Sequence, residues 1–328
     1  MQNLVSIIIP VFNVQSYLEC CLDSVCAQEY RNLDVLLIDD GSTDSSGELC
    51  DLYAKRDSRF RVVHQKNAGA ANAKNTGLDL AQGDYVTFLD SDDWCEPNWI
   101  QHLLNSAIRE NADIVECNFL KEYVNGSESE NVYNSIYNGE WETEEYLRMY
   151  PTAWSCAIFW NKLFRKSCLN NVRFHTDRRC VDDEFFTYRA ITGANKVVRI
   201  DEQLYHYRQR QSSVTQTQNT LYQRTIDDID ILKDRYCWMK EHYPSIAMDY
   251  LRHDVNSLLY FAENFPFNDI ACKHFKVSAW FYLRESLHKF PDALTIFYAC
   301  RTFVYPKKKL RARSRLEDKC PRTERYYG

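Results

Sequence analysis

The segment DYVTFLDSDDW, residues 84 to 94, joins an apolar strand pattern to a run of carboxylates. Residues 85–89 predict a buried strand, and Asp90, Asp92 and Asp93 follow it at once. Carboxylates in that place repel one another and lose hydration, so they indicate a compensating cation or another positive partner. In extended backbone, Asp90 and Asp92 project to the same side. Such oxygen ligands suit Mg²⁺ or Mn²⁺ together with substrate phosphates, whereas an acidic turn that caps the next helix is the alternative.

Three earlier apolar runs repeat this combination of a strand pattern and a polar end. They are VSIIIPVFN (5–13), LDVLLIDDGSTDSS (33–46) and RVVHQKNAGAANAKN (61–75). Each run is short and rich in β-branched residues, as in strands that are buried on both faces, and a helical pattern follows each one. Strands that alternate with helices predict an α/β fold with a parallel sheet and right-handed crossovers.

The polar segments that end these strands are expected to share one edge of the sheet, because ligands bind beyond the carboxyl ends of parallel strands. The segments are Pro10 to Asn13, Asp39 to Gly41, Asn67 to Gly69 and Asp90 to Asp93. Four such segments on one rim favour a ligand site there over a set of unrelated surface turns.

The helix after the second strand has its own signals. Leu49, Leu52 and Tyr53 lie on one helical stripe and are expected to face the core. Ser45 and Glu48 have the spacing of a capping box, in which each side chain accepts a hydrogen bond from the other residue's backbone. The sequence therefore predicts a helix that begins close to Ser45.

The order PVFN, DDGSTD, NAGAANAKN and LDSDD resembles the inverting glycosyltransferases of family two, which have the GT-A fold. The likeness continues through WNKLFRKS (160–167), RCVDDEFFTYRA (179–190) and LYHYRQRQSSVTQ (204–216). The resemblance implies a GT-A, Rossmann-like, mixed and mostly parallel sheet with flanking helices. It also implies transfer of a sugar from a UDP-sugar to a hydroxyl of a glycan or lipid-linked glycan, as in bacterial surface-polysaccharide synthesis. The diphosphate would leave with the help of Mn²⁺ or Mg²⁺.

The same resemblance implies a nucleotide site at the rim. Phe12 would offer a face to uracil, Asp40 would accept from its N3–H, and Asp39 would serve the ribose or hold the loop. Asn67 and Lys74 stand where the family carries Asn and Arg, so Lys74 is expected either to meet the diphosphate as a point charge or to be a solvated helix lysine. The expected nucleotide-binding residues are Pro10, Phe12, Asn13, Asp39, Asp40, Asn67, Lys74 and Asp90.

Carried over onto LDSDD, the resemblance also implies the metal ligands. Asp92 is the expected direct ligand, and Asp90 would bind ribose or reach the metal through water. Asp93 would orient Asp92 or cap the next helix. His206 is a further candidate, as a third metal ligand or a diphosphate contact, since imidazole tolerates Mn²⁺. A structural or acceptor role for His206 is the alternative.

Inversion needs a carboxylate that takes the proton of the acceptor hydroxyl. RCVDDEFF matches the family's Glu-Asp, which implies Asp183 as the general base. Asp182 replaces the usual Glu and is the second candidate, while Glu184 is expected to point elsewhere on the helix. An acidic first turn that complements a helix dipole is the alternative. Arg208 and Arg210 would bind diphosphate or an anionic acceptor, or would be solvated strand ends.

Other functions meet specific objections in the sequence. A sugar-phosphate nucleotidyltransferase needs a Gly-rich basic loop after the first strand, and PVFN is unlike one. A non-catalytic nucleotide-sugar-binding protein is the other alternative, and Asp40, Asp92 and Asp183 speak against it. A phosphatase of the haloacid type would leave DDGSTD without a role. A calcium loop of EF-hand type fails because Trp94 and Cys95 occupy positions that need an oxygen ligand and Gly.

Composition describes an ordinary globular chain, with 45% hydrophobic and 26% charged residues among 328. The net charge of −6 argues against non-specific binding to nucleic acid. Thirteen cysteines without CxxC pairs predict a reduced protein. The first strand begins by Leu4, which leaves no room for a signal peptide, and no run of apolar residues is long enough to span a membrane. We therefore expect a cytoplasmic protein.

The pattern divides the chain near residue 215. Residues 1–215 are expected to form the GT-A domain, with a nucleotide-sugar half (1–95) and an acceptor half (96–215). Residues 216–305 read as a C-terminal helical domain, and 306–328 as a basic tail. Six of the nine residues from 307 to 315 are basic. This predicts peripheral attachment of 306–315 to an anionic surface at the inner face of the plasma membrane, with a solvated terminus as the alternative.

Overall fold

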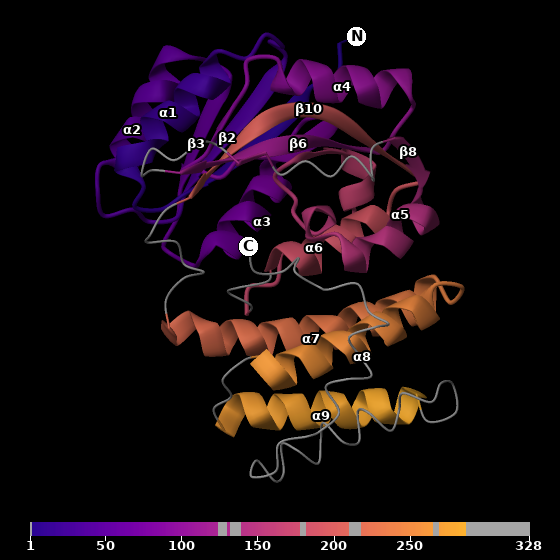
Figure 1. Ribbon diagram of the computed structural model, residues 1–328. Coiled ribbons are helices and arrows are strands. Elements are labelled where there is room, and N and C mark those ends of the chain that lie inside the picture. Colours follow the sequence, from indigo (N-terminus) through magenta and orange to yellow (C-terminus); the bar gives the residue numbers. More distant parts are fainter. Residues whose placement is uncertain are drawn as a thin grey trace. The chain divides into compact units, whose positions relative to one another are not determined.

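The computed structural model describes residues 2–123, 130–131, 139–177, 182–209, 218–264 and 269–286 (Figure 1). The strands are β1 (Val5–Val11), β2 (Leu33–Asp39), β3 (Phe60–His64), β4 (Tyr85–Phe88), β5 (Trp94–Cys95), β6 (Ile114–Tyr123), β7 (Glu130–Asn131), β8 (Gly139–Glu142), β9 (Lys162–Arg165) and β10 (Lys196–Gln209). The helices are α1 (Gln15–Cys26), α2 (Ser46–Arg56), α3 (Ala70–Leu80), α4 (Trp99–Arg109), α5 (Thr143–Met149), α6 (Asp182–Thr192), α7 (Gln218–His242), α8 (Ala247–Asn264) and α9 (Asp269–Ser286).

One sheet organises the first part of the chain. Its strand order is β3-β2-β1-β4-β9-β6-β10-β5, with β7 paired to β6 and β8 paired to β10. The first four strands are parallel, and so are β6 and β10. β9 runs antiparallel between β4 and β6, which makes the sheet mixed. The predicted α/β fold with a mixed, mostly parallel sheet is therefore confirmed.

Helices cover the sheet on both faces (Figure 1), which explains the continuous apolar runs in the sequence. α3 packs on β1 and β2, α2 packs on β3, and α4 packs on β6. Every side chain of β2 is buried, and within β1 only Pro10 is less than fully buried. Because neither face of these strands meets water, their residues do not alternate between apolar and polar.

Gly77 sets the distance between α3 and β1. A Cβ at Gly77 would lie 2.3 Å from Cγ2 of Ile8, a residue in the core. We expect Gly77→Ala to destabilise the protein, because overpacking typically costs about 1 to 3 kcal/mol, against a gain of about 1 kcal/mol in helix propensity. Urea denaturation followed by circular dichroism measures the effect. A midpoint at or above that of the wild type would show that α3 moves away without cost.

The helix α2 begins at Ser46, close to Ser45 as predicted, but its cap and its buried face differ from the prediction. Ser45 makes no side-chain cap hydrogen bond, so the capping box with Glu48 is wrong. The Asp44 carboxylate instead accepts from the backbone N–H of Ser46, at 3.0 Å. The buried stripe consists of Ser46, Cys50 and Tyr53, and Leu52 is exposed. The buried face of α2 therefore differs from the predicted stripe of Leu49, Leu52 and Tyr53: the small residue Cys50 faces the core in place of Leu52.

The described residues form two compact units. The first holds residues 2–146, 156–177 and 182–209 within the described ranges, and therefore the whole sheet. The second holds residues 147–155 together with α7, α8 and α9. The division at residue 215 that the sequence predicts places residues 147–155 with the sheet, whereas in the structure they belong to the helical unit. Residues 124–129, 132–138 and 210–217 lie outside the described residues, and so do 287–328, which include the predicted basic tail.

The helices of the second unit meet around a buried ion pair. Arg235 and Asp254 are both fully buried and 3.0 Å apart. The Tyr282 hydroxyl donates to the other oxygen of Asp254, also at 3.0 Å. The ion pair therefore links α7 with α8, and the Tyr282 hydroxyl links α9 to α8. Removing one partner would leave an uncompensated buried charge.

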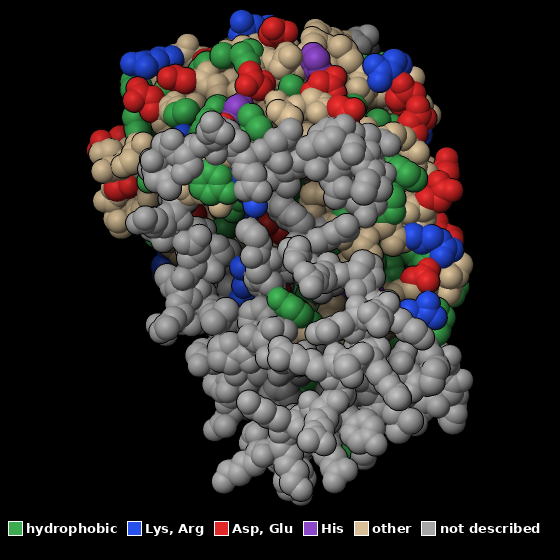
Figure 2. Space-filling view, viewed as in Figure 1, with side chains coloured by type: hydrophobic (Ala, Val, Ile, Leu, Met, Phe, Trp, Pro, Cys, Tyr) green, Lys and Arg blue, Asp and Glu red, His purple; other side chains and the backbone are tan. Residues whose placement is uncertain are grey.

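The sequence predicts a net negative charge and no apolar run that is long enough to span a membrane. Figure 2 shows acidic and basic side chains interspersed on its face of the first unit, without a broad basic field. Across the helices that the structure describes, none is both long and apolar enough to cross a membrane.

Candidate active site

The predicted rim forms at the carboxyl ends of β1 to β4. Because these strands are parallel neighbours, the segments that follow them emerge at the same edge of the sheet. Phe12, just beyond β1, is 45% exposed, so the aromatic ring is not part of the core. Pro10 belongs to β1 itself. The side-chain oxygen of Asn13 accepts from the backbone N–H of Thr43 at 2.8 Å and so joins two of the rim segments.

Asp39 holds the loop after β2. Its carboxylate accepts from the backbone N–H of Ser42 at 3.0 Å and lies 2.7 Å from Nδ1 of His64. Burial raises the pKa of Asp39, but the hydrogen bonds from Ser42 and His64 outweigh it and hold the pKa below its usual value. A carboxylate held in this way stays ionised and fixes the backbone on which Asp40 stands.

Asp40 holds the segment between β3 and α3. Its Oδ1 accepts from Nε2 of Gln65 at 2.7 Å and from the backbone N–H of Ala68 at 2.9 Å, while Oδ2 accepts from the N–H of Gly69 at 2.7 Å. A carboxylate offers about four lone-pair sites, so Oδ2 retains one acceptor position for a further donor. Asn67, on the same segment, is exposed.

The segment Asp90 to Asp93 is a turn and not extended backbone, because the N–H of Asp93 donates to the C=O of Asp90 at 3.0 Å. The expectation that alternation places Asp90 and Asp92 on one side is therefore wrong. Asp93 does not cap α4 either. Its buried carboxylate accepts from the Tyr205 hydroxyl and from the backbone N–H of Arg208, both at 2.8 Å. The turn is thus fastened to β10.

Negative charge accumulates at this turn. Burial first, and then the neighbouring carboxylates of Asp92 and Asp90, raise the pKa of Asp93 well above its usual value, although hydrogen bonds from Arg208 and Tyr205 act the other way. Arg208 reinforces the turn by donating its Nε–H to the C=O of Asp92 at 2.7 Å. Its guanidinium lies over the ring of Trp94, 4.4 Å from the centroid. Arg208 is therefore not a solvated strand end, and Arg210 lies outside the described residues.

Lys74 connects the rim to the candidate base. Its side chain is only 6% exposed, so a solvated helix lysine is wrong. The Nζ atom lies 3.5 Å from Oδ1 of Asp183. It also lies 4.5 Å and 4.3 Å from the ring centroids of Phe159 and Phe174. The ammonium is thus held by aromatic faces and a carboxylate from a segment more than a hundred residues away.

Asp183 lies in the first turn of α6, and 39% of its side chain is exposed. This carboxylate is also close to the rim. Burial, and then the carboxylates of Asp93, Asp90, Asp92 and Asp183, raise the pKa of Tyr207 to about 12. The Tyr207 hydroxyl is therefore close enough to both the acidic turn and the candidate base for their charges to act on it. The side chain of Asp182 lies outside what the structure describes, while Glu184 is buried.

His206 differs from the predicted third metal ligand. Its Nδ1 lies 2.8 Å from Oε1 of Glu122, and its Nε2 lies 2.8 Å from Oε1 of Glu96. The ring also stacks on Trp94, with centroids 4.9 Å apart. Because both nitrogens already face carboxylates, neither is left for a metal. The structural role that the sequence left open fits this geometry.

Sequence reasoning missed the aromatic residues that support the site. Tyr205 and Tyr207 lie two apart on β10, and the ring of Trp160 is 4.3 Å from that of Tyr205 and 5.3 Å from that of Tyr207. The alternation in LYHYRQR was the available signal, since residues two apart on a strand share a face. For Phe159 and Phe174 there was none, because their contacts with Lys74 bring together distant segments.

We expect Tyr205→Phe to destabilise the acidic turn. The substitution would remove the hydrogen bond that the Tyr205 hydroxyl donates to the buried Asp93 carboxylate and the one that it accepts from the N–H of Asp90, at 3.2 Å. Unsatisfied buried groups cost about 1 to 3 kcal/mol each. Tyr53→Phe is the matched control, because its hydroxyl donates at 2.6 Å to the exposed Asp23. Equal losses of unfolding free energy for both variants would contradict the proposed fastening.

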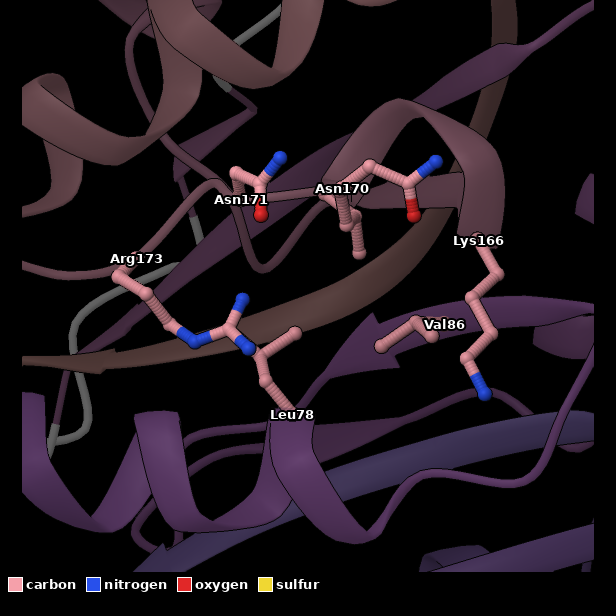
Figure 3. A pocket seen from close by; sticks show the side chains of 7 residues that line it. Leu78, Val86, Lys166, Asn170, Asn171 and Arg173 are labelled. Atoms are coloured by element: carbon pink, nitrogen blue, oxygen red, sulfur yellow. The ribbon is translucent and has the colours of Figure 1, made fainter.

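A separate surface pocket lies away from the rim (Figure 3). Leu78, Val86, Lys166 and Arg173 are among its lining residues, and Val86 is near the amino end of β4. Its cations are engaged locally, because Lys166 donates to the C=O of Ala81 at 2.7 Å and Arg173 donates to Asp79 at 2.7 Å. The candidate active site is therefore the rim and not this pocket.

Comparison with known proteins assigns the class. Residues 6–173 match the family model for glycosyl transferase family 2. The chain belongs to this family, and it is a glycosyltransferase.

Particular relatives agree with this assignment. The glycosyltransferase GlyG of Streptococcus pneumoniae serotype 4 is 36% identical over 234 residues, which are 66% of this chain and 75% of GlyG. The uncharacterized glycosyltransferase EpsJ of Bacillus subtilis (strain 168) is 35% identical over 225 residues, which are 66% of this chain and 64% of EpsJ.

Among solved structures, S. aureus TarS 1-349 in complex with UDP-GlcNAc is similar with a TM-score of 0.73. The match has 18% identity and covers 92% of this chain and 88% of that one. Mannosyltransferase PcManGT from Pyrobaculum calidifontis, in complex with GDP-Man and Mn²⁺, reaches a TM-score of 0.53 at 16% identity, over 94% of this chain and 89% of that one. These likenesses show the GT-A fold.

Proposed function

We propose that the protein transfers a hexose or N-acetylhexosamine from a UDP-sugar, with inversion, to a hydroxyl of a glycan or lipid-linked glycan. The contact between Lys74 and Asp183, at 3.5 Å, is the observation that supports this most strongly. It joins a helix that starts at the nucleotide rim to the segment that matches the family's catalytic base. The carboxylates of Asp90, Asp92 and Asp183 all act on the pKa of Tyr207, which supports a short distance between the acidic turn and the candidate base.

The uridine would lie on the rim. The exposed ring of Phe12 can stack on the base, and the free acceptor position of Asp40 can take its N3–H. Asp39, Asn13 and Pro10 would shape this surface by holding the loops, and Asn67 is accessible to the ribose or diphosphate. Lys74 would place a positive charge beside Asp183, at the end of the rim that the diphosphate would approach.

The acidic turn suits a divalent cation. Its carboxylate oxygens are hard ligands, and Asp90, Asp92 and Asp93 lie in one turn that the N–H of Asp93 closes on the C=O of Asp90. Within the described ranges, no three acidic, His or Cys side chains meet as a closed cation site. Asp92 and Asp90 would therefore hold Mn²⁺ or Mg²⁺ together with substrate phosphate oxygens, as is usual for Mg²⁺. The ion would supply a Lewis acid for the leaving diphosphate.

Asp183 would act as the general base. An inverting transfer needs a carboxylate on the face of the sugar opposite the diphosphate, where it accepts the proton of the acceptor hydroxyl. The exposed part of the Asp183 carboxylate is accessible to an acceptor, while Lys74 contacts one of its oxygens. The ammonium would stabilise the ionised form that a base requires.

The acceptor proposal also bears on location. We propose that the enzyme works in the cytoplasm, at the inner face of the membrane, where it would meet a lipid-linked glycan. Nine cysteines in the described part of the chain are free thiols, which supports a reducing compartment.

The donor proposal predicts which nucleotide stabilises the protein. UDP is expected to raise the free energy of unfolding, by about 2.7 kcal/mol at a hundredfold excess over Kd, and Mn²⁺ is expected to strengthen the effect. Thermal unfolding with UDP, GDP and CDP, each with Mn²⁺ or with chelator, measures the stabilisation by each nucleotide and its dependence on the cation. Stronger stabilisation by GDP or CDP would refute the uridine site, and equal stabilisation by UDP in chelator would refute the cation site.

A further inference from the structure

The outward face of α9 combines exposed apolar and cationic side chains. Val277 is 56% exposed and Trp280 is 63% exposed, which is unusual for large apolar residues. Lys273, Lys276 and Arg284 are exposed on the same helix, and each lies four residues from Val277 or Trp280. At 3.6 residues per turn, the five side chains form one stripe, which we call the α9 stripe.

The opposite face of α9 already serves the fold. Phe275, Ala279, Tyr282 and Leu283 are buried, and α9 packs on α7 and α8. The three-helix unit therefore has no need of Val277 or Trp280 for its core. Leaving an indole in water is unfavourable, so its exposure indicates a surface that is covered in another state.

The charge on the α9 stripe is of one sign. Its three ionisable residues are all cationic, in a chain whose net charge is −6. Two described acidic residues of this unit have other partners: Glu285 accepts from Lys240 at 2.6 Å and from Tyr236 at 3.0 Å, and Asp230 lies 3.2 Å from Nδ1 of His274. Arg284 approaches Glu285 only to 4.0 Å. The stripe is therefore complementary to an anionic surface.

We propose that the α9 stripe binds an anionic lipid bilayer surface. Trp280 and Val277 enter the boundary between headgroups and acyl chains, where amphipathic aromatic rings are favoured. Lys273, Lys276 and Arg284 lie at the level of the lipid phosphates. A second copy of the chain fits less well, because a two-fold contact through this face would bring like charges together. The proposal is independent of the proposed donor and base.

Co-sedimentation of the full chain with vesicles tests this. The wild type is expected to bind vesicles of phosphatidylcholine with about 30% phosphatidylglycerol, to bind pure phosphatidylcholine weakly, and to be released by salt. Changing Lys273, Lys276 and Arg284 to Gln is expected to weaken binding about fivefold per cation, so about a hundredfold together. Trp280→Ser is expected to weaken it about tenfold or more.

Matched controls come from the first unit. Ile108, which is 55% exposed on α4, is changed to Ser, and the exposed cations Lys55 and Arg56 are changed to Gln. These variants are expected to bind as the wild type does. Because all the substituted residues are exposed, each variant should keep the wild-type thermal midpoint, which is measured alongside.

Three outcomes would overturn the proposal. One is binding that is lost equally in the controls. Another is full binding by the α9 stripe variants combined with loss when the basic residues of 307–315 are changed to Gln, which would make the tail the anchor. The last is no vesicle binding by the wild type, together with self-association in sedimentation velocity that Trp280→Ser abolishes, which would make a second copy the partner.

Discussion

Asp183→Asn is expected to lower turnover by about 10² to 10⁴, because removal of a general base costs that much when binding is intact. The amide keeps the shape of the side chain but cannot take the acceptor proton. UDP binding should stay nearly unchanged, since the uridine would rest on Phe12 and Asp40. Steady-state transfer kinetics and thermal stabilisation by UDP, measured on the same preparation, separate the two effects.

The neighbouring Asp182 is the internal control. Asp182→Asn keeps the charge change and the helix position but should reduce turnover less. The reverse order would move the base to Asp182. Small and equal losses for both would mean that the acidic first turn only complements the dipole of α6.

Asp92→Asn is expected to have the second large effect. It would remove the proposed direct cation ligand, so UDP should stabilise the variant equally with Mn²⁺ and with chelator. Turnover should fall by about 10² or more, because a Lewis acid at a leaving group supplies several kcal/mol. Calorimetric titration with UDP, once in Mn²⁺ and once in chelator, measures the dependence of UDP binding on the cation. Transfer kinetics measure turnover.

Asp201→Asn is a suitable control for Asp92→Asn, because Asp201 is an exposed carboxylate on β10. It should leave both quantities unchanged. Retention of Mn²⁺-dependent UDP binding in Asp92→Asn would show that the cation, if needed, has other ligands.

The strands and the rim could be predicted from the sequence because they depend on local patterns. Buried parallel strands read as continuous apolar runs, and a parallel sheet brings the residues that follow its strands to one edge. For that reason the positions of Phe12, Asp39, Asp40 and Asp92 followed from chain order alone.

The rest depended on contacts between distant segments. The sequence leaves Lys74 open between a diphosphate contact and a solvated helix lysine, whereas in the structure Phe159, Phe174 and Asp183 lie around its ammonium. The sequence leaves His206 open between a metal ligand and a structural residue, and only the structure places Glu96 and Glu122 at its two nitrogens. The pairing of β10 with β5 and β6 creates that environment, and no local pattern encodes it.

The configuration of the sugar that the enzyme releases tests the proposed mechanism most directly. An α-linked UDP-hexose that the protein hydrolyses slowly is followed by proton NMR at early times, before the free sugar equilibrates. Attack by water from the side of Asp183, opposite the diphosphate, should give the β-anomer first, and Asp183→Asn should slow its appearance. If the α-anomer appears first, the transfer does not invert, and Asp183 is not a base on the far side of the sugar.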